Sequence, residues 1–360
     1  MYNRITKLLC LVLIVAILAG VFTGCSVQSA DTRNTSTGFV ETTAPSTAAT
    51  SPTIPEPEPE PSLPPKPEPL PPSAAPTLQL STSKKPAQPD IAIPKLSAAN
   101  YFIFDTRLDD FLYSSCKTDK ALYPASTTKL FTTYVALQYL DPAQIVTVGG
   151  ELSYVASDTS TAGFKKGDRV SVEDLAYGAL LPSGCDASYI LAAAAGKVIL
   201  GNENATAKQA INAFMKECNR LGKELGMTKT NFVTPDGYHD PDHKISVQAF
   251  VIIGKCSLEN PVIRKIVSTS SATITYTNSN GKTCTKTYTN TNYCIRPDSK
   301  YYSSLCIGLK TGFTDQAGYC LLTAFEVDGR YILIGIFGCS NSTDRFKDTS
   351  KLFDAYLPYL

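Results

Sequence analysis

The sequence of 360 residues has no tryptophan, two histidines and almost no net charge, since 33 Lys and Arg face 32 Asp and Glu for a formal +1. A balanced chain lacks the basic surface that nucleic-acid binding requires. Two histidines exclude a site built on three imidazoles, and a His-dependent triad would have to use His239 or His243. Pro241 disfavours a helix between them, and two histidines with flanking aspartates seldom close a metal site. We therefore predict a loop there, and no metal.

Proline is scarce except in one segment, because 16 of the 24 prolines lie between Pro45 and Pro94. The run from Pro55 to Pro72 has no apolar periodicity, so it cannot bury enough surface to fold and favours extended polyproline geometry. Residues 25–96 are predicted to be a disordered spacer. It would either hold a domain away from a membrane or link two parts without a length requirement.

Residues 1–24 are predicted to be an export signal. Arg4 and Lys7 precede an apolar run from Leu8 to Val21, which is shorter than the roughly 20 residues of a membrane span. The sequence from Val21 to Cys25 resembles a bacterial lipobox, in which Cys25 would carry a lipid. The alternative is an ordinary secretory signal with Cys25 incidental. Both predict an exported protein, and the lipobox predicts a membrane anchor at the N-terminus, in the envelope of a Gram-positive cell.

Residues 97–360 are long enough for one folded domain. Short β-patterned segments open it, six helical segments follow, and further β-patterned segments and a last helix close it. Ser171 and Asp174 form the start signal of one helix. The other expected helices are 126–140, 187–200, 205–225, 246–256, 261–267 and 343–356, and the expected strands are 101–104, 111–113, 319–327 and 331–338. This order predicts an α+β fold, in which N- and C-terminal segments share an antiparallel sheet flanked by helices, around an all-helical insert.

A first motif, Ser126-Thr127-Thr128-Lys129, stands at the start of a predicted buried helix. A spacing of three places the hydroxyl and the amine on one helical face, about 5–6 Å apart at Cβ. Burial disfavours the charged amine, so Lys129 can take the hydroxyl proton. The helix N-terminus favours the negative charge that develops. The pair is a candidate activated nucleophile.

Two further motifs carry polar groups suited to a peptide substrate. Lys310-Thr311-Gly312 is predicted on a strand, where a cation and a hydroxyl can receive a carboxylate while a peptide lies alongside. Gly312 removes a side chain where a ligand must approach closely. Ser183-Gly184-Cys185 is predicted in the turn between two helices and would supply a second hydroxyl for proton relay.

In this order the motifs resemble the S-x-x-K, S-D-N and K-T-G signature of active-site serine enzymes that bind penicillin. The chain resembles the low-molecular-weight penicillin-binding proteins, the serine D-alanyl-D-alanine carboxypeptidases of peptidase family S11. The resemblance covers 97–360. The segments that carry it are Tyr123–Leu130, Leu181–Ala187, Phe214–Met215, Leu225–Met227, Thr230–Phe232, Pro235–Gly237, His243, Asn290–Asn292 and Gly308–Tyr319. It implies the β-lactamase/DD-peptidase-like fold, here without the C-terminal β-domain or the C-terminal amphipathic anchor that the family often has.

The resemblance also implies a mechanism. Ser126 would attack the carbonyl of the penultimate D-Ala of a peptidoglycan stem peptide, with Lys129 as general base and Ser183 relaying the proton to the leaving D-Ala. Water would then release the acyl-enzyme, without a metal or an organic cofactor. The N–H groups of Ser126 and Phe313 would form the oxyanion hole, and β-lactams would acylate the same serine. The implied substrate-binding residues are Lys310, Thr311, Gly312, Phe313 and Cys185.

Cys185 departs from the family pattern, which has Asn at this position. A thiol is a poor donor and a poor acceptor, and unmatched partners should cost about 1–3 kcal/mol, or roughly 5–150-fold in rate. We predict a slower but active enzyme. The alternatives are a D,D-endopeptidase, a class A β-lactamase, and a penicillin-binding module disabled at Cys185. The Glu-x-x-x-Asn motif of class A β-lactamases does not occur between Cys185 and Lys310.

Of the 11 cysteines, Cys10 would leave with the signal and Cys25 would carry lipid, so nine remain. An odd number cannot pair completely, and no C-x-x-C occurs. Cys320 and Cys339 would lie diagonally across the predicted hairpin, about 7–8 Å apart and too far for easy bridging. We predict mostly free core thiols, which suits a reducing or anaerobic habitat. The cluster Tyr293, Tyr301 and Tyr302 either lines the substrate cleft or packs ordinarily.

Overall fold

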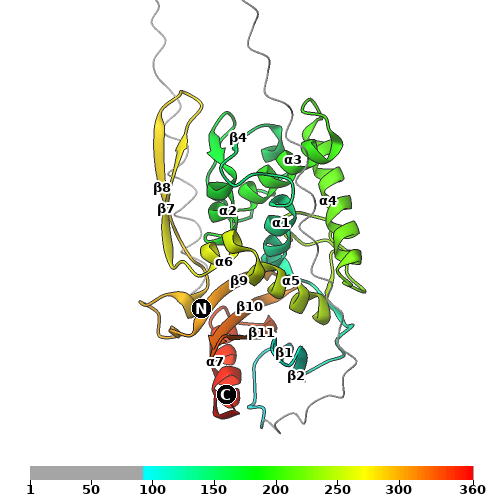
Figure 1. Ribbon diagram of the computed structural model, residues 1–360, viewed down its shortest axis with the longest axis vertical. Helices are drawn as coiled ribbons and strands as arrows, with labels where there is room; N and C mark the ends of the chain where they lie inside the picture. Colours follow the sequence, from blue (N-terminus) through cyan, green and yellow to red (C-terminus); the bar gives the residue numbers. More distant parts are fainter. Residues whose placement is uncertain (1–91, 360) are drawn as a thin grey trace, which may run out of the picture. The chain divides into compact units, whose positions relative to one another are not determined.

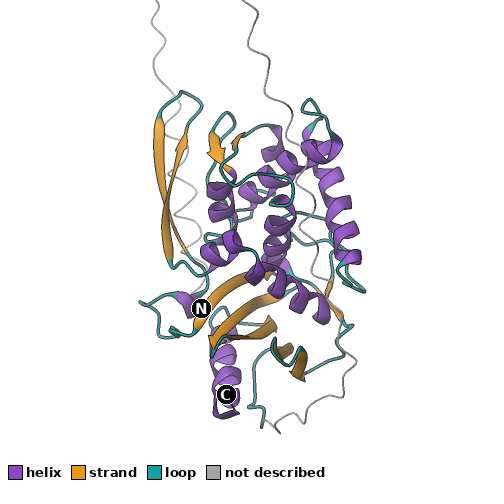
Figure 2. Ribbon diagram, in the orientation of Figure 1, coloured by secondary structure: helices purple, strands orange, loops and turns teal. Residues whose placement is uncertain are grey.

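The structure, a computed structural model, describes residues 92–359. The predicted export signal, Cys25 and almost all of the predicted spacer lie outside the described residues, so their boundaries stay predictions. Within 92–359, strands come first, helices follow, and further strands and a last helix close the chain (Figure 2). This is the order that the sequence predicts.

The central element is a five-stranded antiparallel sheet in the order β2-β1-β11-β10-β9. Its strands are β1 (Asn100–Asp105), β2 (Asp110–Ser114), β9 (Cys306–Thr314), β10 (Gly318–Val327) and β11 (Arg330–Cys339). The N- and C-terminal segments join where β1 pairs with β11, as predicted. The turn Asp328-Gly329 between β10 and β11 has two positive φ angles, of 48° and 72°, which suits the tight hairpin that Asp-Gly predicts. This order leaves β9, which carries Lys310, at an edge of the sheet.

Helices cover both faces of this sheet (Figure 1). One side holds α1 (Thr128–Ala136), α2 (Val172–Leu180), α3 (Cys185–Leu200), α4 (Ala207–Glu224), α5 (Val247–Glu259) and α6 (Pro261–Val267), and the other side holds α7 (Asp344–Tyr356). The first helix is shorter than its predicted 126–140. Ala125–Thr127 form a 3-10 turn, and α1 ends at Ala136, where the backbone N–H groups of Gln138 and Tyr139 bond to carbonyls three residues back, as in a turn.

A second sheet, which the sequence analysis does not assemble, lies beside the helices. Its order is β4 (Ile145–Thr147), β5 (Arg169–Ser171), β7 (Ser271–Thr277) and β8 (Thr283–Thr289). Two of these strands have three residues, too few to show an alternating pattern. A short pair, β3 (Ala121–Leu122) with β6 (Ile245–Ser246), lies just before the Ser126 turn. Strand β8 is followed directly by Asn290-Thr291-Asn292.

Each face of the five-stranded sheet has its own apolar core. Toward the helices, Phe337 of β11 packs against Phe250 of α5, with ring centroids 4.3 Å apart. Toward α7, Phe325 of β10 stacks on Phe353 at 3.9 Å. The sheet is therefore held rigidly between two layers, and β9 is held with it.

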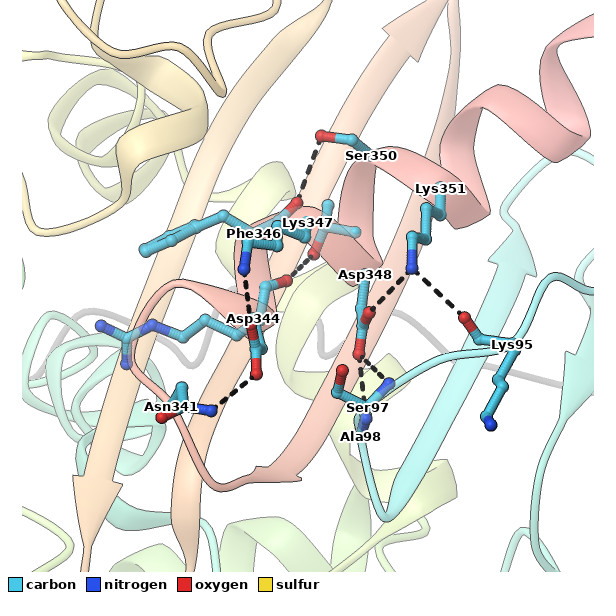
Figure 3. Close-up of polar contacts among 12 residues, drawn as sticks. Lys95, Ser97, Ala98, Asn341, Asp344, Phe346, Lys347, Asp348, Ser350 and Lys351 are labelled. Atoms are coloured by element: carbon cyan, nitrogen blue, oxygen red, sulfur yellow. Dashed lines mark hydrogen bonds and ion pairs between the residues drawn. The ribbon is translucent and has the colours of Figure 1, made fainter.

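Helix α7 also fixes the N-terminal end of the described chain (Figure 3). The buried carboxylate of Asp348 accepts hydrogen bonds from the backbone N–H groups of Ser97 at 2.7 Å and Ala98 at 2.9 Å. Lys351 donates to the carbonyl of Lys95 at 3.3 Å. These contacts tie the segment that precedes β1 to the helix that carries Arg345.

The nine cysteines within 92–359 are all free, and seven of them are buried. Cys339 lies opposite Tyr319 in the β10–β11 ladder rather than opposite Cys320. This agrees with the prediction of free core thiols. No helix among the described residues is both long and apolar enough to cross a bilayer.

Candidate active site

Ser126 and Lys129 lie on one face at the start of α1, as their spacing predicts. The Nζ of Lys129 lies 2.8 Å from Ser126 Oγ, 2.9 Å from the carbonyl oxygen of Asp236 and 3.3 Å from Cys185 Sγ. Lys129 is fully buried, whereas Ser126 is partly exposed. The amine is thus held by three contacts against a hydroxyl that a ligand can reach.

A left-handed residue that is not glycine occurs at each of the three motifs. Ala125, before Ser126, has φ 47°, Ser183 has φ 67°, and Leu309, before Lys310, has φ 78°. Such backbone costs of the order of 1 kcal/mol or more at each position and persists where the surrounding structure enforces it. Each motif therefore contains or directly follows a residue in strained backbone.

Two glycines let separate segments converge on the Ser126 turn. A Cβ on Gly237 would lie 1.9 Å from the carbonyl oxygen of Ala125, and one on Gly312 would lie 3.0 Å from the backbone nitrogen of Ser126. Gly237 brings the carbonyl of Asp236 to Lys129, and Gly312 brings β9 past the Ser126 amide. The close approach that the sequence predicts at Gly312 is therefore an approach of β9 to the Ser126 turn.

Behind this turn lies His243, which is 2% exposed. Its Nδ1 accepts from the backbone N–H groups of Val233 and Thr234, at 3.3 and 3.2 Å, so its Nε2 carries the proton toward Thr128 Oγ1 at 3.2 Å. Burial lowers the pKa of His243 to about 4, so the ring is neutral near pH 7. His243 supports the turn, and His239 packs edge-on against Tyr123. Within 92–359 no three His, Cys, Asp or Glu side chains gather as a metal site would require.

The second motif lies opposite Lys129. Ser183 lies in the turn, but Cys185 is the first residue of α3, which corrects its predicted place in the turn. Ser160 bridges the motif, since its hydroxyl donates to the carbonyl of Ser183 at 2.7 Å and its carbonyl accepts from the N–H of Cys185 at 2.9 Å. Burial raises the pKa of the Cys185 thiol, with the charge of Lys129 opposing. Cys185 is thus a neutral acceptor of the lysine hydrogen bond.

The third motif occupies edge strand β9. Lys310 is 1% exposed, and its Nζ donates to the carbonyl of Thr311 at 3.0 Å. Desolvation lowers the pKa of Lys310 well below its usual value, and the charges of Lys129 and Arg345 lower it further. The hydroxyl of Thr311 lies 2.7 Å from that of Thr291. Lys310 therefore lies behind Thr311, and Thr311 faces the ligand space.

A cavity of about 490 Å³ joins these elements. Of the residues that the sequence predicts for the site, Ser126, Ser183, Cys185, Thr311, Gly312 and Phe313 line it. Lys129 and Lys310 lie beneath its walls. The cavity lining also includes Asp158–Ser160, Tyr238 and Arg345, to which the sequence does not point. Asp236, Gly237 and Thr291, which lie in segments that carry the family resemblance, and His239, which lies in the predicted loop, line it as well.

Arg345 of α7 is the cation that the sequence analysis misses. Its Nη1 donates to the carbonyls of Gly312 at 3.0 Å and Cys320 at 3.4 Å. Its Nε is buried and has no hydrogen-bond partner among residues 92–359. The sequence gives little indication that Arg345 belongs to the site, since it is one of several charged residues on an amphipathic helix. Tertiary structure alone brings it beside Thr311.

The tyrosine cluster packs rather than lining the main cleft. Tyr293 and Tyr301 both stack on Phe346, with centroid distances of 4.8 and 5.6 Å. Tyr302 is exposed. Tyr293 also lines a second, smaller cavity beside the cleft.

Comparison with known proteins identifies the family of the chain. The sequence model of the D-alanyl-D-alanine carboxypeptidase family, peptidase S11, matches residues 83–339. The chain belongs to this family. A D-alanyl-D-alanine carboxypeptidase of Streptomyces sp. strain K15 is 28% identical over 266 residues, which are 72% of this chain and 87% of that protein. D-alanyl-D-alanine carboxypeptidase DacA of Haemophilus influenzae is 30% identical over 284 residues, 76% of this chain and 65% of that protein.

Solved structures agree on the fold. The Streptomyces K15 DD-transpeptidase superposes with a TM-score of 0.67 at 27% identity, over 74% of this chain and all of the other. The ampicillin-bound penicillin-binding protein D2 of Listeria monocytogenes gives a TM-score of 0.57 at 24% identity, covering 73% of this chain and 98% of that one, and it supports the fold alone. The S11 chain described here is thus a serine-type D-alanyl-D-alanine carboxypeptidase of the cell wall, with the α+β fold that the sequence predicts.

Proposed function

We propose that this S11 enzyme removes the terminal D-Ala from peptidoglycan stem pentapeptides through an acyl-enzyme on Ser126. The observation that carries the proposal is the 2.8 Å contact between Ser126 Oγ and the buried Lys129 Nζ, in a cleft walled by β9. Lys129 Nζ takes the hydroxyl proton as Ser126 Oγ bonds to the carbonyl carbon of the penultimate D-Ala. The proton then passes through Ser183 to the leaving amine, the C–N bond breaks, and water later releases the shortened peptide.

We assign the oxyanion hole to the backbone N–H groups of Ser126 and Phe313. Gly312 supports this assignment, because it lets β9 pass beside the Ser126 amide. Two donors aimed at the developing oxyanion would each contribute about 2.7–4 kcal/mol, as such donors do in other serine peptidases.

Recognition of the terminal carboxylate is assigned to Thr311, Lys310 and Arg345. The Thr311 hydroxyl faces the cleft, Lys310 supplies positive charge from beneath it, and Arg345 lines the same wall with an unpartnered buried Nε, as judged over residues 92–359. A carboxylate placed here would gain charge-assisted hydrogen bonds and would favour the protonated form of Lys310.

The same acylation chemistry predicts covalent capture of β-lactams. Incubation with penicillin should add the mass of the drug to the protein, and peptide mapping should place it on Ser126. Purified enzyme should also release D-Ala from a pentapeptide, and Ser126→Ala should do neither. Absence of both an adduct and free D-Ala with the unmodified enzyme would refute the proposal.

We also propose that the protein is exported and anchored to the membrane by lipid on Cys25. The apolar run from Leu8 to Val21 and the Gly24-Cys25 pair support this. Mass spectrometry of the mature N-terminus should find a lipidated cysteine as the first residue. Cys25→Ala should release the protein from the membrane fraction, and a membrane-bound Cys25→Ala protein would contradict the anchor.

A further inference from the structure

A second cavity of about 200 Å³ adjoins the active-site cleft. Thr291 and Arg345 line both spaces, so the two meet at the wall assigned to the terminal carboxylate. The second cavity continues from there between the end of β8 and the start of α7, and its other lining residues are Thr289, Asn290, Tyr293, Arg296, Ser342 and Phe346. The mechanism proposed above makes no use of this space.

Stacked side chains connect the two spaces in one column. The guanidinium of Arg296 lies 4.9 Å from the ring centre of Tyr293, whose ring stacks on that of Phe346 with centroids 4.8 Å apart. The guanidinium of Arg345 lies 4.9 Å from the ring centre of Phe346. Arg345 lies 5.3 Å from the ring of Tyr319, which stacks on Phe313 in the main cleft at 4.2 Å. Arg345 lies between two rings and Arg296 lies over one, and a planar group stacked on a ring loses little further freedom on binding a ligand. The column therefore presents two arginines in fixed positions.

The cavity is electropositive. Arg296 and Arg345 both line it, and among the described residues that line it there is no Asp or Glu. Arg296 makes two hydrogen bonds to the carboxylate of Asp298, from Nη2 at 2.6 Å and from Nε at 3.1 Å. The Asp298 side chain is 69% exposed, so water screens this pair and a ligand carboxylate can compete with it. Arg345 keeps its buried Nε without a partner in the described chain. Guanidinium groups favour carboxylates, which they bind through paired N–H donors.

The position of the cavity restricts what can reach it. Under the proposed function, a linear pentapeptide ends at its carboxylate, against Thr311 and Arg345, and so stops where the second cavity begins. In a cross-linked peptide the scissile amide joins D-Ala to the side chain of a diamino acid on a second stem peptide. That amino acid offers a carboxylate at the same wall, and the rest of the second peptide, with its further carboxylates, must continue beyond it.

We propose that the second cavity is a subsite for the anionic second stem peptide of a cross-linked substrate, with Arg296 as its specificity-determining cation. The proposal rests on the proposed function of Ser126. It makes this chain a D,D-peptidase that accepts cross-linked dimers as well as linear pentapeptides.

The test compares two substrates on one set of variants. The substrates are a linear stem pentapeptide and a tetrapeptide dimer cross-linked through meso-diaminopimelate. Arg296→Gln should lower kcat/KM for the dimer about 5- to 20-fold, which corresponds to one charge-assisted hydrogen bond that solvent partly screens. On the pentapeptide, and in the rate of penicillin acylation, it should differ from the unmodified enzyme by less than about two-fold.

Two further variants separate charge from structure. Lys300→Gln removes a positive charge from the same loop at an exposed position outside the cavity lining, and should leave both substrates unaffected. Arg296→Lys keeps the charge and should restore part of the activity on the dimer. Amidation of the dimer's second-peptide carboxylates should reduce its kcat/KM with the unmodified enzyme and remove the effect of Arg296→Gln.

Equal losses on both substrates with Arg296→Gln would overturn the subsite, since they would show a merely structural role. Unchanged kcat/KM for the dimer, or no cleavage of the dimer by the unmodified enzyme, would also overturn it. If any of these results is obtained, the unmodified enzyme should still release D-Ala from the pentapeptide and bind penicillin covalently. If the proposed function itself is wrong, the unmodified enzyme should do neither.

Discussion

The two walls of the cleft differ in how far their polar groups are satisfied within the protein. The catalytic wall comprises the Ser126 turn with α1, the Ser183 turn with Cys185, and the Asp236 loop. The recognition wall comprises β9 and the start of α7. On the catalytic wall Lys129 has three hydrogen-bond partners. On the recognition wall Lys310 bonds within its own motif, and the Nε of Arg345 has no partner among the described residues.

This difference follows from what each wall must do. A nucleophile must be held in one geometry before substrate arrives, so its supports are internal and already made. A carboxylate site must keep donors free for a group that the substrate brings, and those donors bear a desolvation cost until it arrives. The lowered pKa of Lys310 reports that cost, because burial and two neighbouring cations destabilise its charge. The catalytic wall is preorganised, and the recognition wall is completed by the ligand.

The largest expected effect lies on the catalytic wall. Lys129→Met should reduce the rate of penicillin acylation by about 10³-fold or more, because it removes the base that Ser126 requires. Intact-protein mass spectrometry against time measures this rate. Thr132→Val is the matched control, since Thr132 lies on the same helix, is 2% exposed and bonds to the carbonyl of Pro235. A comparable loss in Thr132→Val would mean that the wall as a whole, rather than the amine, sets the rate.

Protonation of His243 should disrupt the support of the same wall. Its pKa is lowered to about 4 from 6.5, so between these values the unfolded chain binds a proton that the folded protein does not. The free energy of unfolding should therefore fall as pH drops from 6.5 to 4, by up to about 3 kcal/mol. Denaturant unfolding across this range measures the slope. His243→Gln should flatten it and His239→Gln should not, and an unchanged slope in His243→Gln would refute the assignment.

On the recognition wall, activity and stability should move in opposite directions. Lys310→Met should lower kcat/KM for a carboxylate-ended peptide about 10- to 100-fold, through the loss of charge-assisted binding. It should also raise the free energy of unfolding by about 1 kcal/mol or more, because an unpaired buried charge is removed. Peptide kinetics and denaturant unfolding on the same preparation test both signs. A lower free energy of unfolding in Lys310→Met would contradict the idea that the recognition wall bears a desolvation cost that the catalytic wall does not.

The smallest expected effect concerns Cys185. Cys185→Asn should raise the acylation rate about ten-fold, because an amide accepts from Lys129 better than a thiol and can also donate to substrate. We expect the lower part of the 5–150-fold range, since Lys129 already donates to the thiol at 3.3 Å. Stopped-flow acylation with a chromogenic β-lactam measures the change, and Cys185→Ala should be slower than the native enzyme. An unchanged rate in Cys185→Asn would show that the thiol has no kinetic cost.

Local signals predict much of this fold. The β10–β11 hairpin follows from Asp328-Gly329, and the start of α2 follows from Ser171, whose hydroxyl accepts from the N–H of Asp174 at 3.0 Å. The second sheet escapes prediction, because β4 and β5 are too short to show a period and pair through distant segments. Helix α1 is predicted too long because apolar spacing continues to Leu140, whereas the helix ends at Ala136 and is followed by turns.

The candidate site also has a part that the sequence predicts and a part that it does not. Spacing within one helix suffices to place Ser126 beside Lys129, because a helical turn has a fixed geometry. Arg345, Thr291 and the Asp236 loop reach the cleft from distant parts of the sequence, and Gly237 and Gly312 matter because other segments approach them. The family resemblance marks Pro235–Gly237 and Asn290–Asn292 in the sequence, but only the fold shows that these segments meet Arg345 at one cleft.

The sequence by itself determines the family, the three motifs and the order of strands and helices, because each depends on residues near one another in the chain. Only the tertiary structure decides how the walls meet. It places Lys310 behind Thr311 rather than in the cleft, brings Arg345 to the recognition wall, and forms a second cavity beside that wall. The physical reason is that burial, desolvation and the pairing of charges depend on every element packed around a group, and these are properties of the assembled fold.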